Sequence, residues 1–276
     1  SAWIEIRLDR LLSNLNTLKG IAGLDTQIMA VVKANAYGHG LIEIAKALSG
    51  HVAYLGVSNL YEALELKEHG IETPIFLFGR LFGAELQTAI KSELTLSVSS
   101  LEEAREISSL AESSHQKARI HIKIDTGMGR LGIPQHEAVP TVEKIAGLPA
   151  LILDGIYTHF PTAEREDDFM EEQFQNFCSL VQVLEKKGIY FRLKHAANSA
   201  ASLKLIPRSI STSHPIVIPA KAGIQESNPQ WKSMDPRLNH AGMTTFRGVT
   251  NLIRPGLILY GIYPDPSLKQ AGVFHP

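Results

Sequence analysis

This sequence has little cysteine, a small net charge and no long apolar run. Its 276 residues include a single cysteine, Cys178, so no disulfide can form within the chain. Cys178 lies in a predicted helical stretch without zinc-ligand spacing around it, and we expect it to be a buried structural thiol. The composition therefore excludes the disulfide-rich and zinc-stabilised classes of small domain, and we expect no metal site.

The formal net charge is only −1 and the isoelectric point is near 6.8, which excludes a strongly basic surface for nucleic acid or anionic lipid. No run approaches the roughly 18 apolar residues that a membrane-spanning helix needs. The first five residues lack the basic and apolar regions of a signal peptide. We therefore expect a cytoplasmic protein with neither a membrane nor a nucleic-acid partner.

Short β-branched runs alternate along the chain with stretches of helical spacing. The helical stretches include Leu60–His69, which ends before Gly70, Ser99–Leu110, which opens with a capping box, and Phe169–Lys187. Strands joined by crossover helices predict a parallel sheet and an α/β fold. The predicted strands are Gln27–Val32, Val52–Val57, Pro74–Phe78, Leu94–Val98, Arg119–Ile124, Leu151–Tyr157, Tyr190–Lys194 and Asn251–Leu259.

Eight strands in this length fit a (β/α)8 TIM-type barrel, and an open doubly wound sheet is the alternative. Five polar residues favour the barrel, because each lies at or just after the carboxyl end of a predicted strand, where barrel sites are built. Taken alone, Asp125 has a plainer interpretation as a turn residue, and His159 and His195 as structural histidines. The five residues are Lys33, Asp125, His159, His195 and Asn198.

A segment from about Arg208 to Gly248 has neither helical nor strand periodicity and is rich in proline. A structureless stretch of this length is uncommon within a compact domain. Part of it, from Ser213 to Gln225, resembles the translated product of an interspersed bacterial repeat. We interpret the segment as an inserted surface loop in a single domain that spans residues 1–276.

Lys33 ends the first predicted strand and precedes a turn into a predicted helix at Leu41–Leu48. Burial there would lower the pKa of the lysine and make it a nucleophile able to form a Schiff base. The alternative is a side chain that extends from the strand end into solvent. Position alone favours this alternative, because lysine is rarely buried.

The residues around Lys33 change this balance, because they resemble the cofactor-attachment segment of alanine racemases. Four further blocks resemble the same family and follow in its order, so the resemblance covers the chain apart from the proline-rich segment. The five blocks are VVKANAYGHG at 31–40, KIDTGMGRLG at 123–132, GIYTHF at 155–160, HAANSAA at 195–201 and RPGLILYG at 254–261.

The resemblance implies a pyridoxal 5'-phosphate cofactor held covalently by Lys33. It implies that Tyr37, Ser199 and the backbone amides around Gly256 and Leu257 bind the cofactor phosphate, with Asn198 also among the binding residues. A turn of small residues suits this role, because backbone N–H groups can then approach a phosphate closely.

For the rest of the cofactor, the resemblance places Arg254 at the pyridine nitrogen, with His159 beside it. It places Arg130 at the phenolic oxygen and makes Lys123 a candidate for carbamylation. Since arginine keeps its proton, the ring nitrogen would stay unprotonated, which favours return of the proton to Cα over transamination.

The resemblance implies interconversion of L- and D-alanine for cell-wall precursors by a homodimer. The family continues into a C-terminal β-rich domain that we expect to be absent from this chain, and that domain supplies the tyrosine acting as the second base. Lys33 then provides only one of two bases, which predicts that this chain alone is impaired. The alternatives are a non-catalytic carrier barrel for the cofactor and a pseudoenzyme fragment.

Overall fold

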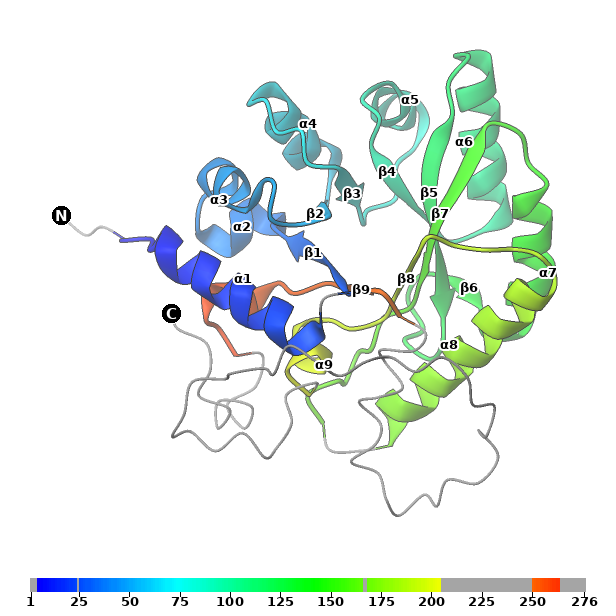
Figure 1. The fold of residues 1–276 in the computed structure, drawn as a ribbon. Coiled ribbons are helices and arrows are strands. Elements are labelled where there is room, and N and C mark those ends of the chain that lie inside the picture. The colour runs from blue at the N-terminus through cyan, green and yellow to red at the C-terminus, as the bar shows by residue number, and fades with distance from the viewer. Residues whose placement is uncertain (1–3, 24, 166–167, 205–249, 264–276) are drawn as a thin grey trace.

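The computed structural model describes residues 4–23, 25–165, 168–204 and 250–263, and its parallel strands form a closed ring. Within these residues the ring order is β4, β3, β2, β1, β9, β8, β7 and β5, and β5 pairs back with β4. Figure 1 shows the larger helices on the outside of the strands. The predicted (β/α)8 barrel is confirmed, and the open-sheet alternative is wrong.

Each predicted strand corresponds to one strand of the barrel, and a short additional strand, β6 at Ile133–Pro134, pairs with the end of β5. The barrel strands are β1 at Gln27–Val31, β2 at Tyr54–Val57, β3 at Ile75–Leu77, β4 at Thr95–Val98, β5 at Ala118–Asp125, β7 at Leu151–Tyr157, β8 at Leu193–His195 and β9 at Leu252–Ile253.

Two of the helices between the strands, at Leu60–Glu68 and Leu101–Ser113, begin at a side-chain cap. Ser100 Oγ accepts a hydrogen bond from Glu103 N at 3.1 Å, and Glu103 Oε2 accepts one from Ser99 N at 2.7 Å, which confirms the predicted capping box. The helices are α1 at Leu8–Ala22, α2 at Lys33–Gly38, α3 at Leu41–Leu48, α4 at Leu60–Glu68, α5 at Gly83–Lys91, α6 at Leu101–Ser113, α7 at Gln135–Ala146, α8 at Phe169–Lys186, α9 at Ser199–Lys204 and the 3₁₀ helix η2 at Leu257–Tyr260.

The core has two layers because inward and outward side chains alternate along barrel strands. The outer layer packs the strands against the helices and contains most of the buried aliphatic side chains. Cys178 lies there on α8 at 4% exposure, and burial raises the pKa of its thiol to about 12. The inner layer fills the barrel with Met29, Tyr54, Phe76, Tyr157, Leu193 and Leu252.

The last two barrel strands differ from the prediction. β8 begins at Leu193 instead of Tyr190, and β9 ends at Ile253 instead of Leu259. The chain leaves β9 because Pro255 has no N–H for the ladder and Gly256 turns the backbone (φ −122°, ψ −98°) into η2. The proline-rich insert predicted at 208–248 lies outside the described residues. Among the described helices, none has the length and apolar character needed to cross a membrane.

Candidate functional site

The turn that carries Lys33 has an unusual backbone. After β1, residues Ala34 to Tyr37 all have φ between 53° and 55°, so they form a left-handed turn without any glycine. Left-handed conformation costs an L-residue about 1–2 kcal/mol. The turn is held by Asn35, whose N–H donates to Glu62 Oε1 at 3.3 Å and whose Oδ1 accepts from Leu41 N at 2.7 Å. Such retained strain is typical of functional sites.

The left-handed turn brings Tyr37 against Gly256, which follows β9. A Cβ on Gly256 would collide with the hydroxyl of Tyr37 and would lie 3.1 Å from its Cζ, so a larger residue here would have to displace the Tyr37 ring. The Gly256 N–H donates to Ser199 Oγ at 2.9 Å. Three residues predicted to bind the cofactor phosphate therefore meet, and Leu257 begins η2 directly after them.

Arg254 is buried in the barrel at 4% exposure. Its Nη2 donates to the carbonyl oxygens of Thr158 at 2.7 Å and Ala196 at 2.8 Å, which ties the side chain to the ends of β7 and β8. Its Nε is buried and has no partner among the described residues. Burial lowers the pKa of Arg254 to about 10, so the guanidinium remains charged at neutral pH.

Positive charge gathers around His159. Burial and the charges of Arg254, Lys123, Arg130 and Lys33 together lower the pKa of His159 to about 3, so this histidine is neutral at physiological pH. Lys123 is only 6% exposed, and burial, Arg130 and Arg254 lower its pKa to about 8. Within the described residues, none of these four cations forms an ion pair closer than 4 Å. The arrangement suits an anionic ligand.

Lys33 and Arg130 are both exposed at this end of the barrel. Lys33 is therefore not buried, which agrees with the alternative that its strand-end position alone favoured, a side chain that extends into solvent. The charge of Lys33 nevertheless contributes to the low pKa of His159.

Tyr157 is a member of the site that the sequence interpretation missed. Its ring lies 5.0 Å from Arg254 Cζ and 5.9 Å from Lys123 Nζ, and its hydroxyl pairs with Ser97 Oγ at 2.7 Å. An aromatic ring facing two cations stabilises both. The available signal was position, because Tyr157 is the last residue of the predicted strand and lies two residues before His159.

Three other predicted strand-end residues have local structural roles. Asn198 Nδ2 donates to Phe160 O at 2.9 Å, and its Oδ1 accepts from Ala201 N at 3.0 Å at the start of α9. Asp125 Oδ1 accepts from Gly127 N at 2.9 Å and Met128 N at 2.8 Å, which is the expected Asx turn. His195 lies inside the barrel at 0% exposure.

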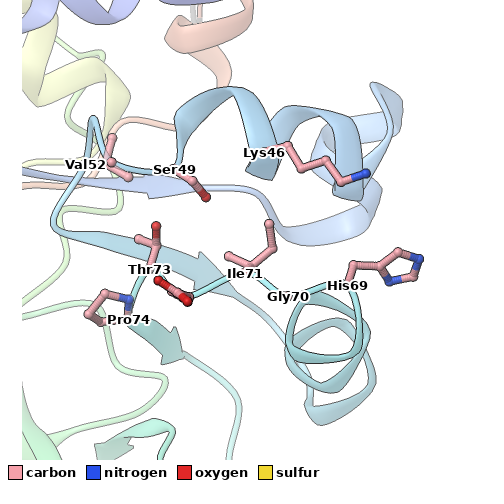
Figure 2. A pocket seen from close by; sticks show the side chains of 10 residues that line it. Lys46, Ser49, Val52, His69, Gly70, Ile71, Thr73 and Pro74 are labelled. Carbon is pink, nitrogen blue, oxygen red and sulfur yellow. The ribbon is translucent and has the colours of Figure 1, made fainter.

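A hollow of about 510 Å³ lies elsewhere, between the ends of α3 and α4 and the amino ends of β2 and β3. Figure 2 shows Val52, Thr73 and Pro74 near the strands, with Lys46 and His69 on the helical side. The amino-terminal face of a barrel generally serves stability and the opposite face serves function. We therefore place the candidate site at the carboxyl ends of the strands.

The fold is a closed β/α barrel that carries a cation cluster and a close Tyr37–Gly256 contact at the carboxyl ends of its strands, an arrangement suited to a small anionic ligand. Comparison with known families identifies which barrel this is. The family model described as "Alanine racemase, N-terminal domain" matches residues 6–213, and the chain belongs to this family.

Curated relatives agree with this assignment. The alanine racemase of Methanococcus maripaludis is 37% identical over 97% of this chain and 62% of its own length. Alanine racemase 1 of Caldanaerobacter subterraneus is 36% identical over 97% of this chain and 59% of its own length. The chain therefore spans about three fifths of the length of these relatives.

Solved structures show the same barrel. The alanine racemase of Clostridium difficile 630 in complex with cycloserine superposes with a TM-score of 0.77 and 32% identity, over 96% of this chain and 62% of that one. The alanine racemase of Bacillus anthracis with bound L-Ala-P gives a TM-score of 0.74 and 29% identity, over 98% of this chain and 60% of that one.

Proposed function

We propose that this chain is the cofactor-bearing barrel of an alanine racemase, a pyridoxal-phosphate-dependent isomerase that interconverts L- and D-alanine. One observation carries the proposal. Four cations without an ion-pair partner among the described residues surround His159, at the same end of the barrel as the Tyr37–Ser199–Gly256 cluster. The Bacillus anthracis structure holds L-Ala-P, which supports alanine as the amino acid that this site receives.

Pyridoxal phosphate fits the residues that are present. Gly256 lets the Tyr37 hydroxyl reach the backbone in the space that a Cβ would fill, and its N–H donates to the Ser199 hydroxyl. We propose that these groups and the Leu257 amide bind the phosphate. Asn198 would help to hold that segment, because its Oδ1 already accepts the N–H of Ala201.

Arg254 would bind the ring nitrogen, since its buried Nε has no partner among the described residues. Arg130 would bind the phenolic oxygen, with Lys123 beside it. Lys123 is suited to carbamylation, because a pKa of about 8 leaves a substantial fraction of its amine unprotonated near neutral pH. Carbamylation would replace one of the clustered positive charges with a negative one that pairs with Arg130.

When bound, pyridoxal phosphate supplies an electron sink that acidifies the Cα–H of an amino acid. Arg254 keeps its proton at neutral pH, because its pKa of about 10 remains well above that range. His159 stays neutral and adds no further positive charge. Lys33 would hold the cofactor covalently until the amino group of the substrate displaces it, and its freed Nζ would then move the Cα proton on one face of the substrate.

Racemisation also needs a base on the opposite face of the substrate, and we propose that a group outside this chain supplies it, within a homodimer.

The whole chain, with residues 208–248 as an insert, would form one barrel domain. Cytoplasmic localisation stays a prediction.

The proposal is tested by adding pyridoxal phosphate to the purified chain and recording its visible absorbance. We expect a band from the lysine-bound cofactor that is lost in Lys33→Ala and kept in Lys91→Ala, a matched change of an exposed lysine at the end of α5. Borohydride reduction should then attach the cofactor to the peptide that contains Lys33. A wild-type chain without the band, or a label on another lysine, would refute cofactor attachment.

Activity is measured separately as exchange between D- and L-alanine by the cofactor-loaded chain. Turnover that is lost in Lys33→Ala would support the racemase. A normal absorbance band without any exchange, even when a full-length family member lacking its own barrel lysine is added as a dimer partner, would instead favour the carrier alternative.

A further inference from the structure

Three buried polar side chains form a continuous chain of hydrogen bonds through the barrel. Asp154 from β7, His121 from β5 and His195 from β8 are each at most 3% exposed. Asp154 Oδ2 lies 3.2 Å from His121 Nε2, and His121 Nδ1 lies 2.8 Å from His195 Nε2. Gly155 makes room for the chain, because a Cβ there would lie only 2.6 Å from His121 Cγ.

The chain begins at an ionised carboxylate. Arg119 Nη1 donates to Asp154 Oδ1 at 2.8 Å, Arg192 Nε and Nη2 donate to its two oxygens at 2.9 and 2.8 Å, and the Tyr54 hydroxyl donates to Oδ2 at 2.9 Å. Burial by itself raises the pKa of Asp154, but hydrogen bonds from His121, Arg192 and Tyr54 outweigh it and hold the pKa well below 3.8. An ionised carboxylate only accepts hydrogen bonds, so His121 Nε2 must carry a proton.

The proton on His121 Nε2 determines where the other ring protons of His121 and His195 lie. Burial lowers the pKa values of both His121 and His195, so each ring is neutral and carries one proton. With its proton on Nε2, His121 has a bare Nδ1 that can only accept. The 2.8 Å contact therefore requires a proton on His195 Nε2, and His195 Nδ1 is left bare.

The far end of the chain lies near Arg254. His195 Nδ1 and Arg254 Nε are both buried without a partner among the described residues, one an acceptor and the other a donor. The charge of Arg254 contributes to the low pKa of His195, so the two residues interact. Tyr157 joins them, since its ring stacks on His195 at 4.7 Å and lies 5.0 Å from Arg254 Cζ.

We propose that Asp154 and His121 are positioning residues for Arg254, which lock His195 as its Nε2–H tautomer. The guanidinium then interacts with a neutral ring whose Nδ1 is an acceptor, and neither an Nδ1–H dipole nor a second positive charge opposes it. Without the lock, His195 would adopt both tautomers, and the Nδ1–H form would add the positive end of an N–H dipole beside the Tyr157 ring that Arg254 also contacts. The effect on the cofactor rests on the proposed function, whereas the tautomer lock does not.

The lock is tested by ¹⁵N NMR of the cofactor-free chain with labelled histidine, because bare and protonated ring nitrogens have well-separated shifts. We expect His195 to be Nε2–H alone in the wild type and a tautomer mixture in His121→Leu. His121→Gln should restore the single tautomer, because its amide can donate to Asp154 and accept from His195. Arg119→Gln is the matched control, since Asp154 keeps Arg192 and the tautomer should not change.

Two NMR results would overturn the lock: a wild-type His195 protonated on Nδ1, or an unchanged single tautomer in His121→Leu. If His121→Leu does not fold, Gly155→Ala breaks the same contacts by displacing the His121 ring. An unchanged single tautomer in Gly155→Ala would then overturn the lock.

The link to Arg254 is tested by titration with pyridoxal phosphate. We expect its Kd to rise roughly tenfold in His121→Leu, as for other residues that orient a ligand-binding group. The Kd should stay near the wild-type value in His121→Gln and Arg119→Gln. Equal Kd values in all four proteins would overturn the positioning role. A wild-type chain that binds no pyridoxal phosphate would refute the proposed function, while the NMR still decides the lock.

Discussion

His159 should make the folded chain sensitive to mild acid. Its pKa is about 3 in the folded state, because burial and four neighbouring cations oppose its protonation. In the unfolded chain it returns to about 6.5. Between these values the unfolded chain binds more protons than the folded one, so the stabilisation present above about pH 6.5 is lost as the pH falls.

The size of the effect follows from the two pKa values. The full shift corresponds to about 5 kcal/mol, of which roughly 2 kcal/mol is lost between about pH 7.5 and about pH 5. His121 and His195 act in the same direction, because burial also lowers their pKa values. The contribution of His159 must therefore be isolated by substitution.

The assay is urea unfolding followed by circular dichroism, with wild type and His159→Asn compared at both pH values. The variant should lose about 2 kcal/mol less stability on acidification than the wild type does. His136→Asn is the matched control, since His136 is 80% exposed on α7 and should change nothing. Parallel losses in wild type and His159→Asn would refute the cation cluster around His159.

Three further changes have definite expected outcomes. The free energy of unfolding of the wild type should rise by up to about 3 kcal/mol between about pH 8 and about pH 10.5, because Lys123 loses its proton in the folded state before it does in the unfolded chain. Urea unfolding in carbonate-free buffer should show that this rise is absent in Lys123→Gln. Ala34→Gly should leave the melting temperature unchanged or raise it, because glycine relieves the left-handed strain, whereas the control Ala84→Gly in α5 should cost about 1 kcal/mol. Gly256→Ala should displace the Tyr37 ring, cost about 1–3 kcal/mol in urea unfolding and abolish binding of pyridoxal phosphate; binding at wild-type affinity would contradict the proposed phosphate site.

The strands of the barrel could be predicted from the sequence because burial enforces a simple pattern. Each run of β-branched residues became a strand, and the parallel arrangement then gathered Lys33, His159 and Arg254 at one end. The error at β9 has a local cause, since the apolar run continues through Leu257 to Leu259 although Pro255 and Gly256 end the ladder.

Two features of the site could not have been predicted in this way. The left-handed turn at Ala34–Tyr37 consists of residues that ordinarily favour other conformations, so local propensity argues against it. The register of β5 against β7 shifts between Ile120 and His121, where Leu153 and Gly155 are their partners, and strict alternation would place Asp154 and Tyr157 on opposite faces. The hydrogen-bonded chain from Asp154 to His195 depends on that irregularity.

The short strand β9 makes completion of the barrel a late event in synthesis. Gln27 of β1 and His195 of β8 both pair with Leu252, so the first and seventh strands of the barrel are joined only through β9, near the end of the described chain. Until that strand emerges from the ribosome, β1 and β8 present unpaired edges that can join other chains. Contacts between residues so distant in sequence also form slowly. Aggregation during expression should therefore depend on how soon β9 arrives, and supplying β9 early by circular permutation is the direct way to change it.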